Sequence, residues 1–518
     1  MRRIGTVLAA AVLTLICYSG AARAADCAAL ANLKIEAANL LSAAEVPAAG
    51  GLPAYCRVLG YVRPAINFEI RLPVAQWNGK FYMAGCGGFC GKLDADKTGF
   101  FNAMNFALRR NYAVSTMDSG HWGSSVTDAR WAYYNPVAKM DWGQRAVTET
   151  ARVTKAVIKA FYGTAQHRSY FAGCSTGGRM AAMEAERFPN DFDGIIVGAP
   201  ALDYTGLVAT FFAWVTQANT RPDGSRIFPT AKVKLLADAV AHACGDADGL
   251  VDDPRRCAFA PAALQCKGAD APDCLTGAET AVLQKWYAGP TDRRGVQLYP
   301  GGLPLGSEAN WPLWETGLGK LPPILPLFGQ EFLRYMAFEP DAGPRYKIAD
   351  FDFDRDPARM AAMAEVYNSA TFEPATQKTV PAADLAAFAK HGGKMILYHG
   401  WGDPLVTPFL TVQYCEAVAK AAGGVDRARD FARLFMVPGM DHCGINTHGP
   451  GIGDEGIDPL SALENWIEKG TAPEALLATK AGPAGAPPLW QRPVCAWPDT
   501  ARLAGGDPHA AASYTCRP

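Results

Sequence analysis

The stretch SYFAGCSTGGRMAAMEA, residues 169–185, decides the fold class of this chain. Its start, Ser169–Ala172, has the apolar character of a buried strand, and the residues from Gly178 onward have the composition of a helix. Between them lies GCSTG, a match to G-x-S-x-G. A strand, a tight glycine turn and a helix in this order form a nucleophile elbow, which exposes the serine hydroxyl at the end of a strand. We therefore predict that Ser175 is a nucleophile, the alternative being a structural serine in a glycine-rich turn.

Other short apolar runs with strand character lie on both sides of this motif. Helical stretches separate them, as in residues 142–161, where Ala146, Val153 and Val157 fall near helical spacing. Strands that alternate with helices predict a parallel sheet in an α/β fold. The predicted strands are Phe81–Ala84, Tyr112–Met117, Ser169–Ala172, Ile195–Gly198, Met395–Tyr398 and Leu434–Val437.

Two late strands lead into residues that can activate a serine. A serine hydroxyl needs a general base, and the base needs an acid that orients it. Asp403 and His442 follow the last two predicted strands, where open α/β sheets carry their sites. The chain order Ser, Asp, His is that of the α/β-hydrolases, so we predict a triad of Ser175, His442 and Asp403. His399 is an alternative base, and Asp441 is an alternative acid.

A glycine-rich loop follows the predicted strand Phe81–Ala84. Backbone N–H groups must stabilise the oxyanion that forms when a serine attacks an ester. Thr176, directly after the nucleophile, supplies one donor by the geometry of the elbow. We predict that Gly88 supplies the second, with Gly87 as the alternative donor. A tight turn without a catalytic role is the competing interpretation of this loop.

The strand–helix alternation is lost from about residue 205 to residue 385, where proline, glycine, cysteine and aromatic residues are frequent. We predict an α/β core, residues 25–204 and 386–518, that carries a large inserted domain, residues 205–385. A chain of 518 residues is long enough for this division. Aromatic side chains of the insertion either clamp a substrate or form its own core. They include Phe211, Phe212, Trp214, Trp286, Trp311, Trp314, Phe332 and Tyr335.

The N-terminus has the pattern of an export signal. Arg2 and Arg3 precede the apolar run Ile4–Cys17, and Ala22-Arg23-Ala24 resembles an A-x-A cleavage site. We predict that residues 1–24 are a secretory signal peptide and that the protein is secreted or periplasmic. A membrane anchor is the alternative, but the apolar run is too short to span a bilayer.

The chain contains 14 cysteines, a number that is typical of an oxidising compartment. Because Cys17 falls in the predicted signal peptide, an odd number remains, and at least one thiol is free or pairs outside the chain. Cys174 precedes the predicted nucleophile and Cys443 follows the predicted base, so a bridge between them would join the two loops. The other predicted bridges are Cys27–Cys56, Cys244–Cys257, Cys266–Cys274 and Cys495–Cys516, which leaves Cys86, Cys90 and Cys415 unassigned.

Charge and composition exclude several classes of protein. Lys and Arg total 49 against 50 Asp and Glu, so the net charge of −1 gives no electrostatic basis for binding nucleic acid. Hydrophobic residues make up 49% of the chain, which excludes a disordered protein. No apolar stretch after the predicted signal peptide is long enough to cross a bilayer, so we expect no membrane partner.

These residues resemble a known family. Cys174-Ser175, Asp403 and His442-Cys443 are similar to the Cys-Ser, Asp and His-Cys arrangement of the tannase and feruloyl esterase family. The similarity runs from Tyr55–Val58 through Trp77–Phe81 to Pro438–Cys443. It implies a secreted carboxylesterase with an α/β-hydrolase core, a large lid, no organic cofactor and a small aromatic ester as substrate. Relatives cleave feruloyl esters, galloyl esters or mono(2-hydroxyethyl) terephthalate.

The resemblance also implies a possible calcium site in CGDADGLVDD, residues 244–253. Carboxylates at alternate positions around a glycine turn suit calcium, which prefers oxygen ligands, and similar family members carry a calcium loop at this place in the lid. Their loop looks longer, so one or two ligands are missing here. The candidate ligands are Asp246, Asp248, the Leu250 carbonyl and Asp252, and the alternative is a solvated acidic turn.

Two other functions stay open at this point. A serine peptidase of the same fold would use the same triad. A binding module without activity would normally have lost one member of the triad, whereas all three are present. The sequence does not specify an oligomeric state.

Overall fold

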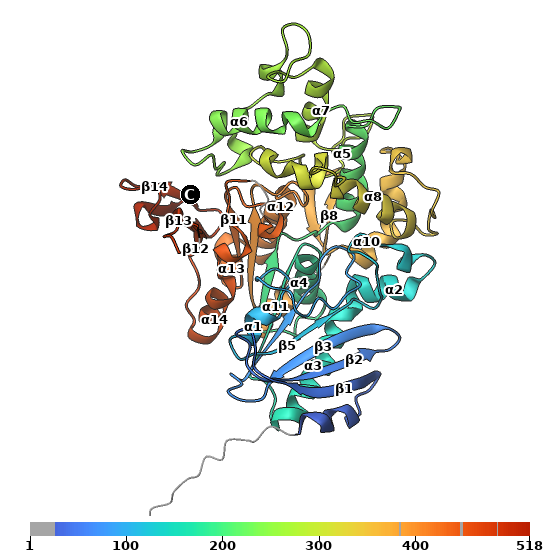
Figure 1. The fold of residues 1–518 in the computed structure, drawn as a ribbon, viewed down its shortest axis with the longest axis vertical. Coiled ribbons are helices and arrows are strands. Elements are labelled where there is room, and N and C mark those ends of the chain that lie inside the picture. Colours follow the sequence, from blue (N-terminus) through green and yellow to red (C-terminus); the bar gives the residue numbers. More distant parts are fainter. Residues whose placement is uncertain (1–25, 383–384, 446–448, 484) are drawn as a thin grey trace, which may run out of the picture.

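The computed structural model describes residues 26–382, 385–445, 449–483 and 485–518, so the predicted signal peptide lies outside the described residues. A nine-stranded sheet runs through the molecule (Figure 1), in the order β1-β2-β3-β5-β4-β6-β7-β10-β11. Its strands are β1 Ala38–Val46, β2 Tyr55–Val62, β3 Ile66–Pro73, β4 Lys80–Ala84, β5 Ala113–Met117, β6 Arg168–Cys174, β7 Gly194–Gly198, β10 Lys394–Gly400 and β11 Ala432–Val437. All six strands predicted from the sequence are present.

The sheet is mixed, so the prediction of a parallel sheet is wrong for its N-terminal part. The six neighbouring strands from β5 to β11 are parallel, but β1, β2 and β3 are antiparallel, and β3 is antiparallel to β5. β2 and β3 are joined by only three residues, 63–65, a connection too short for parallel neighbours.

Side chains of the central strands alternate between two hydrophobic cores, one on each face of the sheet. In β10, Met395 and Leu397 belong to the core that includes α3, α4 and α12, and Ile396 and Tyr398 belong to the core that includes α1 and α14. Helices on both faces of a mostly parallel sheet give an α/β-hydrolase fold. These helices are α1 Asn105–Leu108, α3 Ala146–Tyr162, α4 Thr176–Arg187, α12 Phe409–Ala422 and α14 Pro459–Lys469, with α2 Pro136–Met140 and α13 Val425–Arg429 at the periphery.

The chain between β7 and β10 forms a mostly helical insertion. Helices α5 to α8 lie together at one end of the molecule, opposite β1–β3 (Figure 1). Trp286 and Trp311 pack edge to face, with ring centroids 5.1 Å apart, and both contact Phe228. These two tryptophans therefore form the core of the insertion. Its elements are α5 Phe212–Ala218, α6 Val233–Cys244, α7 Gly277–Ala288, α8 Ile324–Tyr335, α9 Asp356–Arg359, α10 Ala361–Tyr367, β8 Ala370–Glu373, β9 Lys378–Pro381 and α11 Ala386–His391, with π-helical turns at Gly206–Phe211 and Pro312–Thr316.

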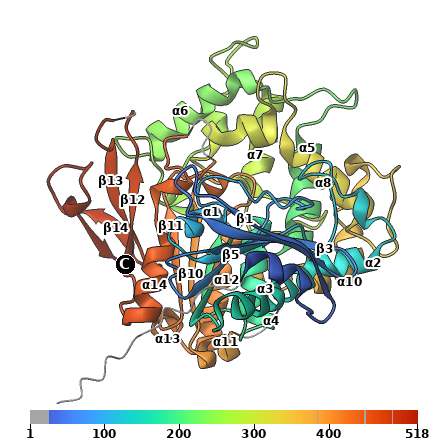
Figure 2. The same cartoon turned by 60° about the horizontal axis from the view of Figure 1, so that its bottom comes forward.

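Two C-terminal hairpins flank the sheet beside β11 (Figures 1 and 2). They pair β12 Ala475–Lys480 with β13 Trp490–Cys495, and β14 Thr500–Leu503 with β15 Tyr514–Arg517. The sequence analysis did not predict these four strands. Two of them, β14 and β15, have no buried residue and so lack the apolar run that marks a strand. A bridge between Phe435 and Ala496 attaches the hairpins to the sheet.

Six disulfide bonds join the described part of the chain. Five connect the pairs expected from the sequence, including Cys174–Cys443, and the sixth is Cys86–Cys90. Cys415 is the free thiol among the described residues. In the same residues, no helix combines the length and the apolar character that a membrane span requires.

Candidate active site

Ser175 lies in the turn between β6 and α4, with φ 65° and ψ −124°. A non-glycine residue with this backbone conformation is strained and is held by its surroundings. The flanking glycines make the turn possible: a Cβ on Gly173 would lie 2.4 Å from the Gly177 backbone, and one on Gly177 would lie 2.5 Å from Asn102 Oδ1. The predicted elbow can form because glycine, which has no Cβ, stands at the two positions where a larger residue would not fit.

Asp403 and His442 lie in contact at the ends of β10 and β11. Asp403 Oδ2 is 2.7 Å from His442 Nδ1, and Asp403 Oδ1 accepts the N–H groups of Leu405 at 3.0 Å and Val406 at 2.9 Å. Burial opposes ionisation of this carboxyl, but His442 and His399 outweigh burial and hold the pKa of Asp403 below its usual value. An ionised Asp403 requires Nδ1 of His442 to carry the proton, which leaves Nε2 free to accept one.

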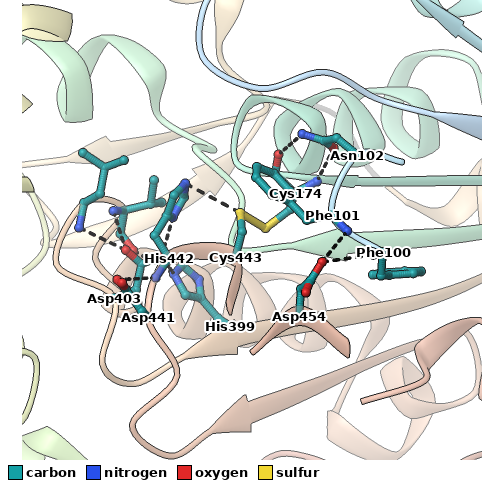
Figure 3. Close-up of a disulfide and its surroundings, with 12 residues drawn as sticks. Phe100, Phe101, Asn102, Cys174, His399, Asp403, Asp441, His442, Cys443 and Asp454 are labelled. Atoms are coloured by element: carbon teal, nitrogen blue, oxygen red, sulfur yellow. Dashed lines mark hydrogen bonds and ion pairs between the residues drawn. A yellow bond between two sulfur atoms is a disulfide. The ribbon is translucent and has the colours of Figure 1, made fainter. Parts of the chain in front are cut away.

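The two alternatives from the sequence make other contacts (Figure 3). His399 is fully buried, with Nδ1 2.8 Å from Thr411 Oγ1 and Nε2 2.7 Å from the Val406 carbonyl and 3.2 Å from Asp403 Oδ2, so it supports the Asp403 loop. Asp441 accepts the backbone N–H of His442 at 2.6 Å and the indole N–H of Trp314 at 3.0 Å, and does not contact the imidazole.

Ser175 and His442 line the same cavity, whose volume is about 270 Å³. The disulfide between their neighbours, Cys174 and Cys443, has a Cα–Cα distance of 6.0 Å and joins the two loops (Figure 3). Ser175 Oγ makes no hydrogen bond to any described residue, and His442 Nε2 is 3.6 Å from Cys443 Sγ. Catalytic hydrogen bonds are often formed only when substrate binds. The other lining residues are Cys86, Gly87, Gly88, Cys90, Lys92, Asp94, Lys97, Phe101, Val126, Leu313, Trp314, Ile324, Phe328, Leu405 and Ile445.

The predicted oxyanion loop borders this cavity. Thr176 Oγ1 donates to the Gly88 carbonyl at 2.7 Å, which attaches the loop to the elbow. Thr176 is the first residue of α4, so its N–H is not used by the helix. Among the described residues, the N–H groups of Gly87 and Gly88 have no hydrogen-bond partner, and both glycines line the cavity. The Cys86–Cys90 bridge, which the sequence analysis missed, closes this loop.

Asn102 is a site residue that the sequence did not indicate. Its Oδ1 accepts the N–H of Cys174 at 2.9 Å, and its Nδ2 donates to the Cys174 carbonyl at 3.2 Å. Asp454 Oδ2 accepts the N–H groups of Phe100 at 3.0 Å and Phe101 at 3.2 Å (Figure 3). The segment before Asn102 is thereby held against the residue that precedes the nucleophile. No local pattern marks Asn102, because its partner lies 72 residues away.

The predicted calcium ligands Asp246 and Asp248 contact a cation of the protein itself. The Arg492 guanidinium, from β13, donates to Asp246 Oδ2 and to Asp248 Oδ2. His509 Nε2 is 3.1 Å from Asp248 Oδ1. Asp246 Oδ1 accepts the N–H groups of Asp248 at 2.9 Å and Leu250 at 3.0 Å. Every carboxylate oxygen of the pair therefore has a partner.

The remaining candidate ligands do not complete a site. The Leu250 carbonyl accepts the N–H of Asp246 at 3.0 Å, and Asp252 is exposed. Within the described ranges, no group of three or more His, Cys, Asp and Glu side chains is arranged to hold a metal. The loop in this arrangement does not fit calcium. A measurement with the metal tests whether calcium binds here.

We expect excess chelator, or added calcium, to leave the melting temperature of the protein unchanged. We expect Arg492→Met to lower it by roughly 1–3 °C, because two carboxylates lose a largely buried partner at a cost of about 1–3 kcal/mol and the entropy of unfolding of a chain of this length is large. Differential scanning calorimetry measures both effects, with Arg517→Met as a control that removes an exposed arginine from the same hairpins. A wild-type melting temperature that falls in chelator would show that calcium does bind.

We expect the Cys174→Ala/Cys443→Ala double variant to stay folded at 25 °C and to lose roughly a hundredfold in kcat, because a displacement of about 1 Å has this effect on catalysis. Five other bridges remain to hold the fold. Ester hydrolysis and circular dichroism measure the two effects. Cys266→Ala/Cys274→Ala, which removes a bridge of the insertion, should keep the wild-type kcat, and equal rates for both double variants would contradict this role.

Three comparisons with known proteins agree. The sequence profile described as "Tannase and feruloyl esterase" matches residues 52–517. An uncharacterized esterase of Xanthomonas campestris is 34% identical, over 96% of this chain and 92% of the relative. Mono(2-hydroxyethyl) terephthalate hydrolase of Piscinibacter sakaiensis is also 34% identical, over 90% of this chain and 85% of its own. The crystal structure of feruloyl esterase B from Aspergillus oryzae superposes with a TM-score of 0.78 at 25% identity, covering 94% of this chain and 98% of that one.

Proposed function

Since the chain belongs to the tannase and feruloyl esterase family and is a carboxylic ester hydrolase, we propose that it is an exported serine esterase that cleaves esters of aromatic acids with Ser175, His442 and Asp403. The observation that carries this proposal is the 2.7 Å contact between Asp403 Oδ2 and His442 Nδ1, beside the bridge that joins the neighbours of His442 and Ser175. Ser175 and His442 line one cavity, and Asp403 contacts His442, which supports the roles of nucleophile, base and orienting acid.

In the first half of the proposed reaction, Ser175 Oγ attacks the ester carbonyl carbon and His442 Nε2 takes the hydroxyl proton. The carbonyl oxygen becomes an oxyanion that accepts hydrogen bonds from the N–H groups of Thr176 and Gly88. Asp403 stabilises the positive imidazolium through Nδ1. When the tetrahedral intermediate collapses, the bond to the alcohol oxygen breaks, His442 protonates that oxygen, and the acid stays on Ser175 as an ester.

In the second half, water replaces the alcohol. His442 Nε2 removes a proton from the water as its oxygen attacks the acyl carbon, and the same N–H groups stabilise the second oxyanion. Collapse of this intermediate breaks the bond to Ser175 Oγ, which receives the proton from His442. The carboxylic acid leaves, and the enzyme returns to its starting state.

An aromatic acid suits the walls of the cavity. Phe101, Trp314 and Phe328 line it, and Leu405 and Ile445 supply aliphatic surface. Aromatic side chains favour stacked or edge-to-face contacts with an aromatic ligand. Trp314 and Phe328 come from the insertion, which we propose acts as a lid over the site and selects the acid. Eight aromatic residues of the insertion were candidates from the sequence to contact the substrate. Trp314 lines the cavity, and the other seven are not among its lining residues.

Hydrolysis of methyl ferulate, methyl gallate and mono(2-hydroxyethyl) terephthalate tests the proposal, with release of acid followed by liquid chromatography. We expect turnover of at least one of these esters and none with Ser175→Ala. A peptide p-nitroanilide tested beside them distinguishes an esterase from a peptidase of the same fold. Cleavage of the anilide without cleavage of any ester would reject the proposal. Amino-terminal sequencing of the exported protein tests removal of residues 1–24.

Monoesters of terephthalic acid are the second candidate substrates. The relative named mono(2-hydroxyethyl) terephthalate hydrolase aligns with 90% of this chain at 34% identity. The same triad and oxyanion donors would act on such an ester, so the relative rates in the panel decide between the two substrate classes.

A further inference from the structure

Lys97 stands apart from the triad in the wall of the same cavity that Ser175 and His442 line. Its side chain is partly buried, and its Nζ lies 3.6 Å from the centroid of the Phe101 ring, within reach of a cation–π contact. None of the steps proposed above uses this ammonium group. The contacts of this ammonium group therefore indicate its role.

The ammonium of Lys97 has no oxygen partner, which distinguishes it from comparable lysines. Seven lysines of the described residues are buried or partly buried, and in six of them Nζ bonds to a carboxylate or a carbonyl. The side chain of Lys97 makes neither a hydrogen bond nor an ion pair with any described residue. Because a cation that has lost water and gained no partner is unfavourable, this position is suited to an oxygen brought by a ligand.

The described residues around Lys97 form no ion pair with its ammonium group. Asp94, which also lines the cavity, and Asp454 act on Lys97 from beyond ion-pair distance. Burial lowers the pKa of Lys97, and these two carboxylates oppose the shift. Asp454 binds the N–H of Phe101 and Asn102 binds Cys174, so the segment that carries Lys97 is attached to the nucleophile turn (Figure 3). The Phe101 ring that Lys97 contacts therefore belongs to a segment held against the nucleophile turn.

We propose that Lys97 is a specificity residue that binds a carboxylate of the substrate, and that the preferred esters are aromatic esters which retain a free carboxylate. This inference rests on the proposed esterase function. A phenol stays neutral at pH 7, with a pKa near 10, so a carboxylate is the anion that such esters carry. It can belong to the acid half, as in a monoester of a dicarboxylic acid, or to the alcohol half, as in an ester of quinic acid.

Two pairs of substrates separate these sources. Monomethyl terephthalate and dimethyl terephthalate differ by a carboxylate on the acid half. Chlorogenate and methyl caffeate share their acid and differ in the alcohol, which carries a carboxylate in chlorogenate. We measure kcat and KM for all four with the wild type, Lys97→Met and Lys97→Arg. Lys159→Met, which removes the same charge from the exposed surface of α3, is the control.

We expect Lys97→Met to lower kcat/KM for the anionic member of one pair by at least about tenfold, mainly through a higher KM. Loss of a hydrogen bond to a charged group weakens binding by about this factor. The neutral member should change less than about twofold, Lys97→Arg should restore most of the loss, and Lys159→Met should match the wild type. Two results overturn the role of Lys97 and leave the esterase function standing. One is an equal loss of kcat/KM on the anionic and the neutral ester of a pair, and the other is no loss on any of the four esters. A wild type that cleaves none of the four esters but turns over methyl ferulate or methyl gallate overturns the preference for a carboxylate and leaves the esterase function standing, whereas no turnover of any of these esters rejects both.

Discussion

Replacement of Ser175 or His442 by alanine is expected to lower kcat on an aromatic methyl ester by a factor of at least about 10⁴, as loss of a triad member does in other serine hydrolases. Without Ser175 Oγ no covalent acyl intermediate can form, and without the imidazole nothing removes the proton of the hydroxyl. The two losses should be similar in size, because the residues act as one unit. Acid release measured over hours at high enzyme concentration gives the residual rate.

The structure indicates that Ser175→Ala should leave stability nearly unchanged. Ser175 Oγ makes no hydrogen bond to the described residues, so its removal breaks no interaction. His391→Ala is a suitable histidine control, since His391 is exposed at the end of α11 and should keep the wild-type rate. A Ser175→Ala protein that keeps its melting temperature and more than about 1% of the rate would show that another group is the nucleophile.

Asp403→Asn is expected to lower kcat by about 10⁴, by analogy with the same change in another triad. An amide at this position can present its NH₂ to Nδ1 of His442, which favours the tautomer with the proton on Nε2. That tautomer cannot accept the proton of Ser175. The variant should remain folded, because an asparagine oxygen can still accept the N–H groups of Leu405 and Val406 that Asp403 Oδ1 binds.

Asp441→Asn is the matched control, and we expect its kcat to stay within about fivefold of the wild type. An amide oxygen can accept the same two N–H groups, from His442 and Trp314. A reversed result, with a large loss for Asp441→Asn and a small one for Asp403→Asn, would exchange the roles of the two acids.

The same variant has an expected effect on stability against pH. Burial and the charge of Asp403 raise the pKa of Asp441 to about 7. A folded-state pKa above the unfolded value near 4 means that the native state binds more protons, so stability falls as pH rises from about 4 to 7. Asparagine does not titrate. The melting temperature of Asp441→Asn relative to the wild type should therefore rise over this range.

Local sequence patterns predicted the elbow and the parallel strands because one strand and its turn contain the whole signal. The glycines around Ser175 are such a case, since the groups they must accommodate lie within a few residues. The two acids that follow strands, Asp403 and Asp441, are harder to separate by pattern. The sequence predicts Asp403 with Asp441 as the alternative, and the structure distinguishes them by their position relative to the imidazole.

Contacts between distant residues carried no signal in the sequence. The Asn102 side chain bonds to the Cys174 backbone, which no motif encodes. The acidic loop has the pattern of a calcium site, but Arg492 reaches Asp246 from 246 residues further along the chain. The Cys86–Cys90 bridge had a visible cue in two cysteines that flank the paired glycines, and it was overlooked because the loop was considered for its N–H groups alone.

The Cys174–Cys443 bridge turns the intervening chain into a covalent ring, since the two cysteines have a sequence separation of 269. A protease that nicks the insertion once therefore cannot release either fragment. The nucleophile and the base stay on one covalent molecule, which migrates at full size on a non-reducing gel and as two pieces after reduction. Cleavage of the insertion therefore does not by itself separate Ser175 from His442. A nicked preparation keeps the two residues on one covalent molecule until its disulfides are reduced.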